Sequence, residues 1–333
     1  MEMTFTSSDI QLFIITVNRP AYCQQALESL LAQKGPLDIW VLDNSVNDDT
    51  EKIIKKYPKV NYVRTDANIP SANLKKMQEL ISKPYTLTLH DDDLLHPNYL
   101  ELALKILNHY KDISFIGPKA NCFYSQNPPE QYYKIKTLST KHWLIENQPD
   151  FALSFWDKPS PCWSGSIIIS QYYKNINTDL NAKTYGKISD WPLLIEMMPK
   201  GKAVIFADKN CFFYRIHKGQ DTNCNDTGIS LTQLTNYLAY FKKYALTNKQ
   251  LYKIYFRRSV SNAISNWRFF TSKQELAKKT EDELLIYLKE KNILTWPMIF
   301  YYKTDRQAIT KIFNIPFKLY CKRNYYKKFL KQL

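Results

Sequence analysis

Glycine is scarce in this sequence, with 7 glycines among 333 residues against a usual share of about 7%. Neither a G-x-G-x-x-G fingerprint nor a Walker-type loop occurs in the chain. The sequence therefore excludes the two common glycine-rich phosphate loops, in which the backbone closely approaches the phosphates. Any nucleotide that this protein binds must be held by other means.

Long apolar runs and paired cysteines are missing as well. No run reaches the roughly eighteen apolar residues that a membrane-spanning helix needs. The 6 cysteines include no C-x-x-C pair, which argues against a disulfide framework and a zinc site. The first residues show no basic region followed by an apolar run, so no signal peptide is predicted. These absences together predict a reducing, cytoplasmic setting.

Positive charge is abundant and lies mostly at one end of the chain. The net charge is +15, and residues 241–333 hold 21 Lys and Arg but only 6 Asp and Glu, whereas residues 1–240 hold 25 of each kind. A shift in charge of this size marks a domain boundary. We therefore predict a first domain at residues 1–228 and a helical, basic domain at residues 229–333.

Apolar, β-branched runs alternate with helical patterns in the first part of the chain. Strands are predicted at 11–18, 38–43, 60–64, 85–89 and 113–117, and helices at 21–33, 50–57, 71–82 and 98–110. This alternation predicts an α/β fold with a mostly parallel sheet and helices on both faces. Later strands are predicted at 161–169, 203–207 and 211–214, the last two antiparallel, whereas residues 119–160 show no regular pattern.

Three adjacent aspartates follow the fourth predicted strand. The sequence His90-Asp91-Asp92-Asp93 comes directly after this strand and shortly before a helical pattern. Adjacent carboxylates repel each other unless a cation lies between them, and carboxylate oxygens favour Mg²⁺ or Mn²⁺. The alternative is a solvated turn whose acids cap the next helix. These residues alone leave both interpretations open.

Polar side chains also follow the first two strands. Thr16, Asn18 and Arg19 end the first strand, and Asp43 ends the second. Ligands of parallel sheets bind at the carboxyl ends of the strands, where these residues and the aspartates are expected to meet. For Asp43, an Asx turn is an alternative role.

Three more candidates lie later in the chain. Asp190 precedes Trp-Pro near a predicted helix start, where it could be an N-cap or a general base. Arg215 and His217 alternate onto one face at the end of the last strand. Such a basic pair could bind phosphate or a metal, or it could be an exposed strand end with a solvated histidine.

Taken in order, these residues resemble family 2 glycosyltransferases of the GT-A fold, which build bacterial surface polysaccharides. The resemblance rests on Thr16-Val17-Asn18-Arg19, Val41-Leu42-Asp43-Asn44-Ser45, Leu89-His90-Asp91-Asp92-Asp93-Leu94-Leu95-His96-Pro97, Ser189-Asp190-Trp191 and Tyr214-Arg215-Ile216-His217. It extends over the first two thirds of the chain. It implies a Rossmann-like, mostly parallel central sheet, followed here by the helical basic extension.

The resemblance also implies roles for individual residues. Contacts to a UDP-sugar are implied for Thr16, Asn18, Arg19, Asp43, Asn68, Asn73, Asp91, Asp93 and Arg215. Asp43 would accept a hydrogen bond from the uracil N–H. A Mn²⁺ or Mg²⁺ ion would bind Asp92, with Asp91 and His217 as further ligands, and would bridge the diphosphate. Asp190 would be the catalytic base that takes the proton from the acceptor hydroxyl.

The sequence departs from the family pattern in three places. Counting back from Pro97, His90 stands where the first aspartate of the metal motif is usually found, which makes Asp92 the principal expected ligand. The segment 68–73 lacks the glycine and arginine that family members often carry there. Ser189 replaces the usual acidic residue before the base.

The C-terminal third is expected to be helical, with helices at 231–246, 248–270, 273–291 and from 305 onward. Residues 306–333 contain eight basic residues and no acid, interleaved with Phe, Tyr and Leu. A helix of this kind can lie on an anionic membrane surface, where each basic residue contributes about 1 kcal/mol. The alternatives are a solvated helix face and a nucleic-acid patch. The aromatic residues among the charges favour the membrane surface.

The residues and the resemblance together predict a metal-dependent, inverting glycosyltransferase. It would transfer a sugar from a UDP-sugar to a hydroxyl of a glycan or lipid-linked saccharide. Its expected location is the cytoplasm, peripheral on the inner face of the cell membrane. The alternative is a catalytically silent GT-A-like module that docks on a membrane or on nucleic acid.

Overall fold

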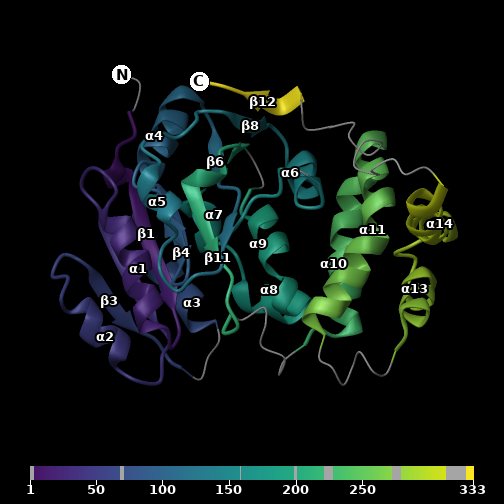
Figure 1. Ribbon diagram of the computed structural model, residues 1–333, viewed down its shortest axis with the longest axis horizontal. Helices are drawn as coiled ribbons and strands as arrows, with labels where there is room; N and C mark the ends of the chain where they lie inside the picture. The colour runs from purple at the N-terminus through teal and green to yellow at the C-terminus, as the bar shows by residue number, and fades with distance from the viewer. Residues whose placement is uncertain are drawn as a thin grey trace.

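The computed structural model describes residues 4–67, 71–157, 159–198, 201–220, 228–271, 279–312 and 328–333. A large central sheet lies between helices on both of its faces, and the C-terminal helices stack at one end of the molecule (Figure 1). Within the described parts of the chain, no helix is both long enough and apolar enough to cross a membrane.

Nine strands form the large sheet, in the order β12-β8-β10-β6-β9-β4-β1-β2-β3. The bounds are β1 (Ile10–Thr16), β2 (Asp38–Asp43), β3 (Asn61–Arg64), β4 (Tyr85–His90), β6 (Ile113–Gly117), β8 (His142–Ile145), β9 (Ser166–Ile169), β10 (Lys202–Phe206) and β12 (Leu330–Lys331). The four strands β3, β2, β1 and β4 are parallel neighbours. Strand β9 runs antiparallel to both β4 and β6, while β10 is parallel to β6. The predicted mostly parallel α/β sheet is therefore confirmed.

Helices cover both faces because successive strand residues point to opposite sides. The helices are α1 (Pro20–Leu31), α2 (Asp49–Ile54), α3 (Ala72–Leu80), α4 (Tyr99–His109), α5 (Glu130–Lys134), α6 (Gln148–Ser154), α7 (Ser170–Lys174), α8 (Thr178–Tyr185) and α9 (Asp190–Glu196), followed by the C-terminal set. Leu12 and Ile14 of β1 pack in the core that α1 and α4 close, whereas Phe13 packs in the core on the other face. This alternation is the two-residue period of a strand buried on both sides.

The segment 119–160 is more regular than its sequence predicts. It contains β7 (Asn121–Phe123), α5, β8 and α6. Strand β8 exists through its antiparallel pairing with β10, which lies far along the chain. Helix α6 has a local signal in the sequence. The Asn147 side chain accepts a hydrogen bond from the backbone N–H of Asp150, and Pro149 lies in the first turn of the helix.

A small second sheet reaches the end of β4. Its order is β5-β11-β7, with β5 at Leu94–Leu95 and β11 at Phe212–Arg215. The predicted strand at 211–214 is thus antiparallel to β5 but parallel to β7. Since β5 begins directly after Asp93, this sheet brings the end of β11 against the three aspartates.

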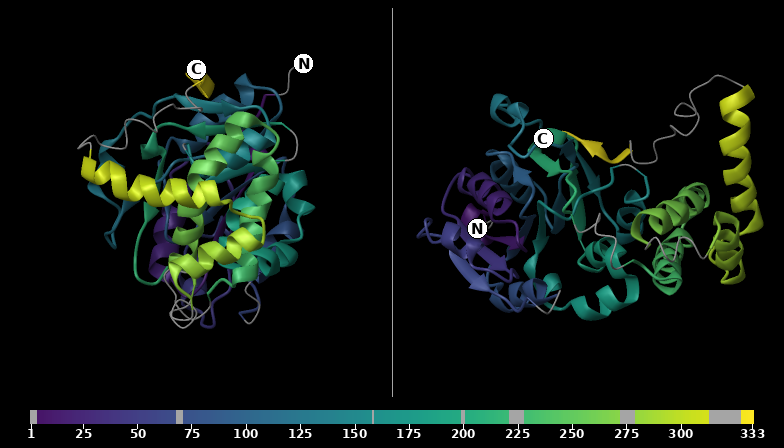
Figure 2. Two further views of the ribbon diagram at one scale, coloured as in Figure 1. Left: turned by 90° about the vertical axis from the view of Figure 1, so that its right-hand side faces the viewer. Right: turned by 60° about the horizontal axis from the view of Figure 1, so that its bottom comes forward.

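The C-terminal helices are α10 (Leu231–Ala245), α11 (Lys249–Phe270), α13 (Glu281–Glu290) and α14 (Trp296–Ile312). Helix α14 begins earlier than predicted, with Pro297 in its first turn, where proline is tolerated. Helices α10 and α11 pack on α6, and their side chains continue the core of one sheet face. In Figure 2, α14 is the outermost layer beyond α11. We retain residues 229–333 as a proposed second domain.

The chain returns to the large sheet at its C-terminus, where β12 pairs antiparallel with β8. Most of the segment 306–333 that is expected to contact membranes lies outside the described residues.

Candidate functional site

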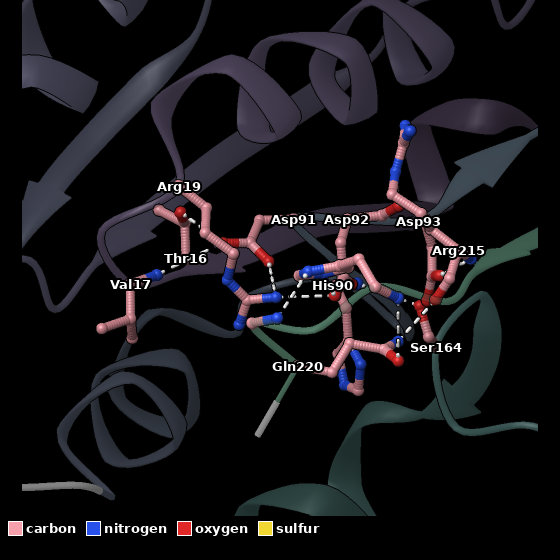
Figure 3. Close-up of polar contacts among 12 residues, drawn as sticks. Thr16, Val17, Arg19, His90, Asp91, Asp92, Asp93, Ser164, Arg215 and Gln220 are labelled. Carbon is pink, nitrogen blue, oxygen red and sulfur yellow. Dashed lines mark hydrogen bonds and ion pairs between the residues drawn. The ribbon is translucent and has the colours of Figure 1, made fainter. Parts of the chain in front are cut away.

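Three buried carboxylates lie together at the carboxyl end of β4. Asp91, Asp92 and Asp93 are 1%, 5% and 0% exposed, so water does little to screen their mutual repulsion. Burial of several charges is costly unless cations and hydrogen-bond donors surround them. The donors around this acid cluster, which we define as Asp91–Asp93, come from β1, from Arg19 directly before α1 and from β11 (Figure 3).

Asp91 is held by the end of β1. Its Oδ2 atom accepts hydrogen bonds from the Thr16 hydroxyl at 2.7 Å and from the Val17 backbone N–H at 3.3 Å. Its Oδ1 atom lies 3.2 Å from Nη1 of Arg19. Burial nevertheless raises the pKa of Asp91 to about 7, because desolvation outweighs the nearby positive charge of Arg19.

Asp92 is contacted by two basic side chains at the same oxygen. Its Oδ2 atom lies 2.6 Å from Nη1 of Arg19 and 3.0 Å from Nε2 of His217. His217, which the sequence predicts as a metal ligand, thus lies in direct contact with the acid cluster. The Tyr22 ring lies against the His217 ring, with centroids 5.0 Å apart.

Asp93 is the most deeply buried of the three. Its Oδ1 atom accepts a 3.0 Å hydrogen bond from the Arg215 backbone N–H, whereas its Oδ2 atom is buried with no hydrogen-bond partner among the described residues. Burial, and then the charge of Asp92, raise the pKa of Asp93 well above its usual range. An unpaired buried carboxylate oxygen is costly in free energy unless a ligand satisfies it.

Asp93 belongs to a group of side chains that fits a divalent cation. Ligand atoms of His90, Asp92 and Asp93 all lie within 4.8 Å of one another. One imidazole nitrogen and two carboxylates form a reasonable donor set for a first-row divalent ion. The sequence assigns Asp91, Asp92 and His217 as ligands. The group includes Asp92, whereas Asp91 is bonded to Thr16 and Val17. The ligand roles of Asp91, Asp92 and His217 stay predictions.

Arg215 supports the acid cluster from beneath. Its side chain is fully buried and donates to the carbonyl oxygens of Asp92, Ser125 and Gln126 and to Oε1 of Gln25. The guanidinium also lies 4.4 Å from the centre of the Tyr22 ring. These contacts use its donors within the protein, so contact with a donor phosphate, which the sequence predicts, stays a prediction.

The ends of β1 and β2 meet as expected. Asn18 has a positive φ of 54°, and its backbone N–H donates to Oγ of Ser45 at 2.7 Å. Asp43 forms the Asx turn that was its alternative role, since its Oδ1 atom accepts from the Ser45 N–H at 2.8 Å. Its Oδ2 atom accepts from the Tyr62 hydroxyl at 2.8 Å. Both oxygens of this fully buried carboxylate are therefore engaged, and its uracil contact stays a prediction.

The structure describes one of the two asparagines, Asn68 and Asn73, that are expected to contact the donor. Asn73 is buried and bridges two strand ends, donating to the Thr16 carbonyl at 3.3 Å and accepting from the Thr65 hydroxyl at 2.7 Å. Asn68 lies outside the described residues.

Asp190 is the first residue of α9 and is partly exposed. Its charge contributes, after burial, to raising the pKa of Tyr173 and of Tyr237. Helix α9 packs against α6 and α8, on the face of the sheet that also carries α10 (Figure 1). The assignment of Asp190 as the catalytic base stays a prediction.

Comparison with known proteins decides the family. Residues 12–176, which run from β1 beyond α7, match the family model described as Glycosyl transferase family 2. This chain carries a family 2 glycosyltransferase domain. It is therefore an enzyme of the glycosyltransferase class, and the fold expected from the sequence is confirmed. Asp190, Arg215 and His217 lie beyond the matched residues.

Solved structures of S. aureus TarS share the fold of this glycosyltransferase. The structure of TarS 1-349 in complex with UDP has a TM-score of 0.57 at 14% identity and covers 89% of this chain and 92% of that one. The complex with UDP-GlcNAc has a TM-score of 0.56 at 14% identity, covering 78% and 74%. At this identity the likeness shows the fold alone. No curated protein sequence matches the chain.

Several residues of the glycosyltransferase site were not identified from the sequence. Ser164 accepts a 3.0 Å hydrogen bond from the His90 N–H, Tyr62 binds Asp43, and Gln25 binds Arg215. Each reaches the site through tertiary packing, so no local pattern marks it. His90 did carry a signal, because it occupies the position of an expected aspartate.

Proposed function

We propose that this glycosyltransferase is a metal-dependent, inverting enzyme that transfers a sugar from a UDP-sugar to a hydroxyl of a lipid-linked or surface glycan. The observation that carries the proposal is the group of the half-buried His90 and the buried Asp92 and Asp93 at the carboxyl end of β4, beside the polar ends of β1 and β2. The open side of a parallel sheet at its carboxyl edge is where ligands bind.

The donor would lie across the ends of β1 and β2. Thr16, Asn18 and Arg19 line this edge, and Asp43 lies beneath it with Tyr62. UDP and UDP-GlcNAc are the ligands of the TarS structures with the same fold, which supports a UDP-sugar as donor here. We propose no particular sugar.

Mn²⁺ or Mg²⁺ would be held by Asp92 together with His90 and Asp93, and the unpaired Oδ2 of Asp93 supports this set. Such an ion supplies charge neutralisation for a leaving diphosphate, which is often the largest catalytic contribution. The protein adds positive charge of its own at the same place through Arg19, and His217 contacts the same carboxylate. Arg215 fixes the backbone that carries these acids.

An inverting displacement also needs a base on the side of the sugar away from the diphosphate. We assign this role to Asp190, whose carboxylate would accept the proton of the acceptor hydroxyl as that oxygen attacks the anomeric carbon. Its position at the start of α9 leaves it partly exposed, as an acceptor site requires.

The test compares Asp190→Asn with Asp179→Asn. Asp179 is a matched control, because it lies in the first turn of α8 and is exposed. In the presence of Mn²⁺, Asp190→Asn is expected to bind UDP like the wild type but to lose transfer and UDP-sugar hydrolysis, whereas Asp179→Asn keeps both. Full turnover by Asp190→Asn would refute the assignment of the base. A wild type that hydrolyses no UDP-sugar with Mn²⁺ would refute the choice of donor.

We further propose that the enzyme works in the cytoplasm, peripheral on the inner face of the membrane. The support is the basic, aromatic segment 306–333, which has no acid. Attraction to an anionic leaflet would bring the enzyme to a lipid-linked acceptor.

A further inference from the structure

Arg19 places its positive charge between two carboxylates of the acid cluster. A single atom, Nη1, lies 2.6 Å from Oδ2 of Asp92 and 3.2 Å from Oδ1 of Asp91. The two carboxylates are almost completely buried, whereas the Arg19 side chain is 25% exposed. Arg19 thus bridges two buried acids from the solvent side, as a bound cation would.

The carboxylate that Arg19 contacts belongs to a residue of the candidate metal group. Oδ2 of Asp92 already receives Nη1 of Arg19 and Nε2 of His217. Asp92 also belongs to the group of three residues that fits a divalent ion. A metal ion and a guanidinium that share one carboxylate repel each other strongly in a poorly screened site.

Hydrogen bonds fix the backbone that carries Arg19, while its side chain is 25% exposed. The Val17 N–H donates to Asp91 and the Asn18 N–H donates to Ser45, and Pro20 begins α1 directly after Arg19. Arg215 differs, because its guanidinium is fully buried and donates to three carbonyl oxygens. Of these two arginines beside the acid cluster, Arg19 is the one that is accessible to solvent.

We propose that Arg19 is an exchangeable counter-ion: it neutralises Asp91 and Asp92 in the metal-free enzyme, and a divalent metal displaces it from Asp92, which turns its guanidinium toward the diphosphate of the donor. The inference rests on the proposed metal site. It gives one residue two opposite effects, since Arg19 weakens the binding of metal alone and strengthens the binding of nucleotide once metal is present. An ion pair that stays fixed on Asp92 would also repel the metal, but its removal would not weaken the binding of nucleotide.

The experiment titrates the full chain with Mn²⁺ alone, and then with UDP at saturating Mn²⁺, by calorimetry. Arg19→Gln is expected to bind Mn²⁺ about tenfold more tightly than the wild type, because a repelling cation is gone, and to bind UDP about tenfold more weakly. Arg64→Gln is the matched control. Arg64 lies at the same edge of the sheet and pairs with Glu51, and this variant removes the same charge; it should leave Mn²⁺ affinity unchanged.

The outcomes distinguish the proposed metal site from the proposed counter-ion role of Arg19. If Asp92→Asn abolishes Mn²⁺ binding but Arg19→Gln binds Mn²⁺ no more tightly than the wild type, the metal site stands and the counter-ion role is refuted. If neither the wild type nor Arg19→Gln binds Mn²⁺, the metal dependence fails and the exchange fails with it. Should Arg19→Gln not fold, Arg19→Met also removes the charge while keeping much of the length of the side chain, and its Mn²⁺ affinity must exceed that of the wild type.

Discussion

The hydroxyl of Thr16 donates a 2.7 Å hydrogen bond to Oδ2 of Asp91, with both residues 1% exposed. This bond joins the carboxyl ends of β1 and β4, which are neighbours in the sheet. It stabilises the ionised form of a carboxyl group whose pKa burial raises to about 7. The charge of the acid cluster near neutral pH therefore depends on a threonine of a different strand.

A first prediction concerns pH. Protonation of Asp91 removes negative charge as the pH falls through about 7, and a metal binds the ionised cluster, so protons compete with metal. Mn²⁺ affinity is therefore expected to fall between about pH 8 and pH 6, as measured by calorimetry. In Thr16→Val, the loss of a donor to the carboxylate raises the pKa of Asp91 further, which shifts the fall in affinity to higher pH.

Thr88→Val is the control for this prediction. Thr88 is an equally buried threonine on β4, and its hydroxyl contacts the sulfur of Met77 and not the acid cluster. Thr88→Val should leave the pH dependence of Mn²⁺ affinity unchanged. A shift of the same size in both variants would show that general loosening of the sheet, and not the hydrogen bond to Asp91, moves the profile.

A second prediction concerns the choice of metal. The imidazole of His90 favours first-row transition ions, whereas Mg²⁺ prefers oxygen ligands. The wild type is expected to bind Mn²⁺ more tightly than Mg²⁺, and His90→Asp should lower the ratio of the two affinities by about tenfold. Competition titrations of Mn²⁺ with Mg²⁺ measure this ratio. An unchanged ratio would mean that His90 is not a ligand.

Much of the fold follows from local pattern, whereas much of the site does not. The apolar runs predict β1, β2 and β4 closely because these strands are buried on both faces. By contrast, β8 forms by pairing with the distant β10. The aspartates are recognisable because they adjoin one another in the sequence, but Arg19 and His217 meet on one oxygen of Asp92 only in three dimensions.

The same difference between local pattern and tertiary packing applies to the side chain of Arg215. Its alternation with His217 suggests a phosphate contact, since both side chains are basic. In the structure the guanidinium faces carbonyl oxygens of the loop 125–126 and of Asp92. Whether a strand-end arginine points to a ligand or to the backbone depends on loops distant in sequence, which its own neighbours do not encode.

A third prediction follows from this burial. Arg215→Met keeps much of the volume but leaves several buried carbonyl oxygens without their donor, and should lower the free energy of unfolding by roughly 3–5 kcal/mol. Arg215→Lys should recover little of this, because an ammonium cannot reproduce the fork of a guanidinium. Urea denaturation measures both. Arg268→Met, which breaks the exposed ion pair with Glu281, is the control and should cost less than about 1 kcal/mol.

The last prediction tests the basic C-terminal segment. At about 1 kcal/mol for each basic residue near an anionic surface, replacing Lys322, Arg323 and Lys327 by Gln should weaken binding to phosphatidylglycerol-containing vesicles by roughly a hundredfold. Sedimentation with vesicles measures this, and vesicles of phosphatidylcholine alone should bind neither protein. The control carries Lys52, Lys55 and Lys56 as Gln, which removes the same charge from the exposed α2 region. Equal loss of vesicle binding in both variants would mean that net charge, and not this segment, directs binding. No loss in the C-terminal variant would refute the proposed membrane association, while the proposed chemistry at the carboxyl end of β4 would be unaffected.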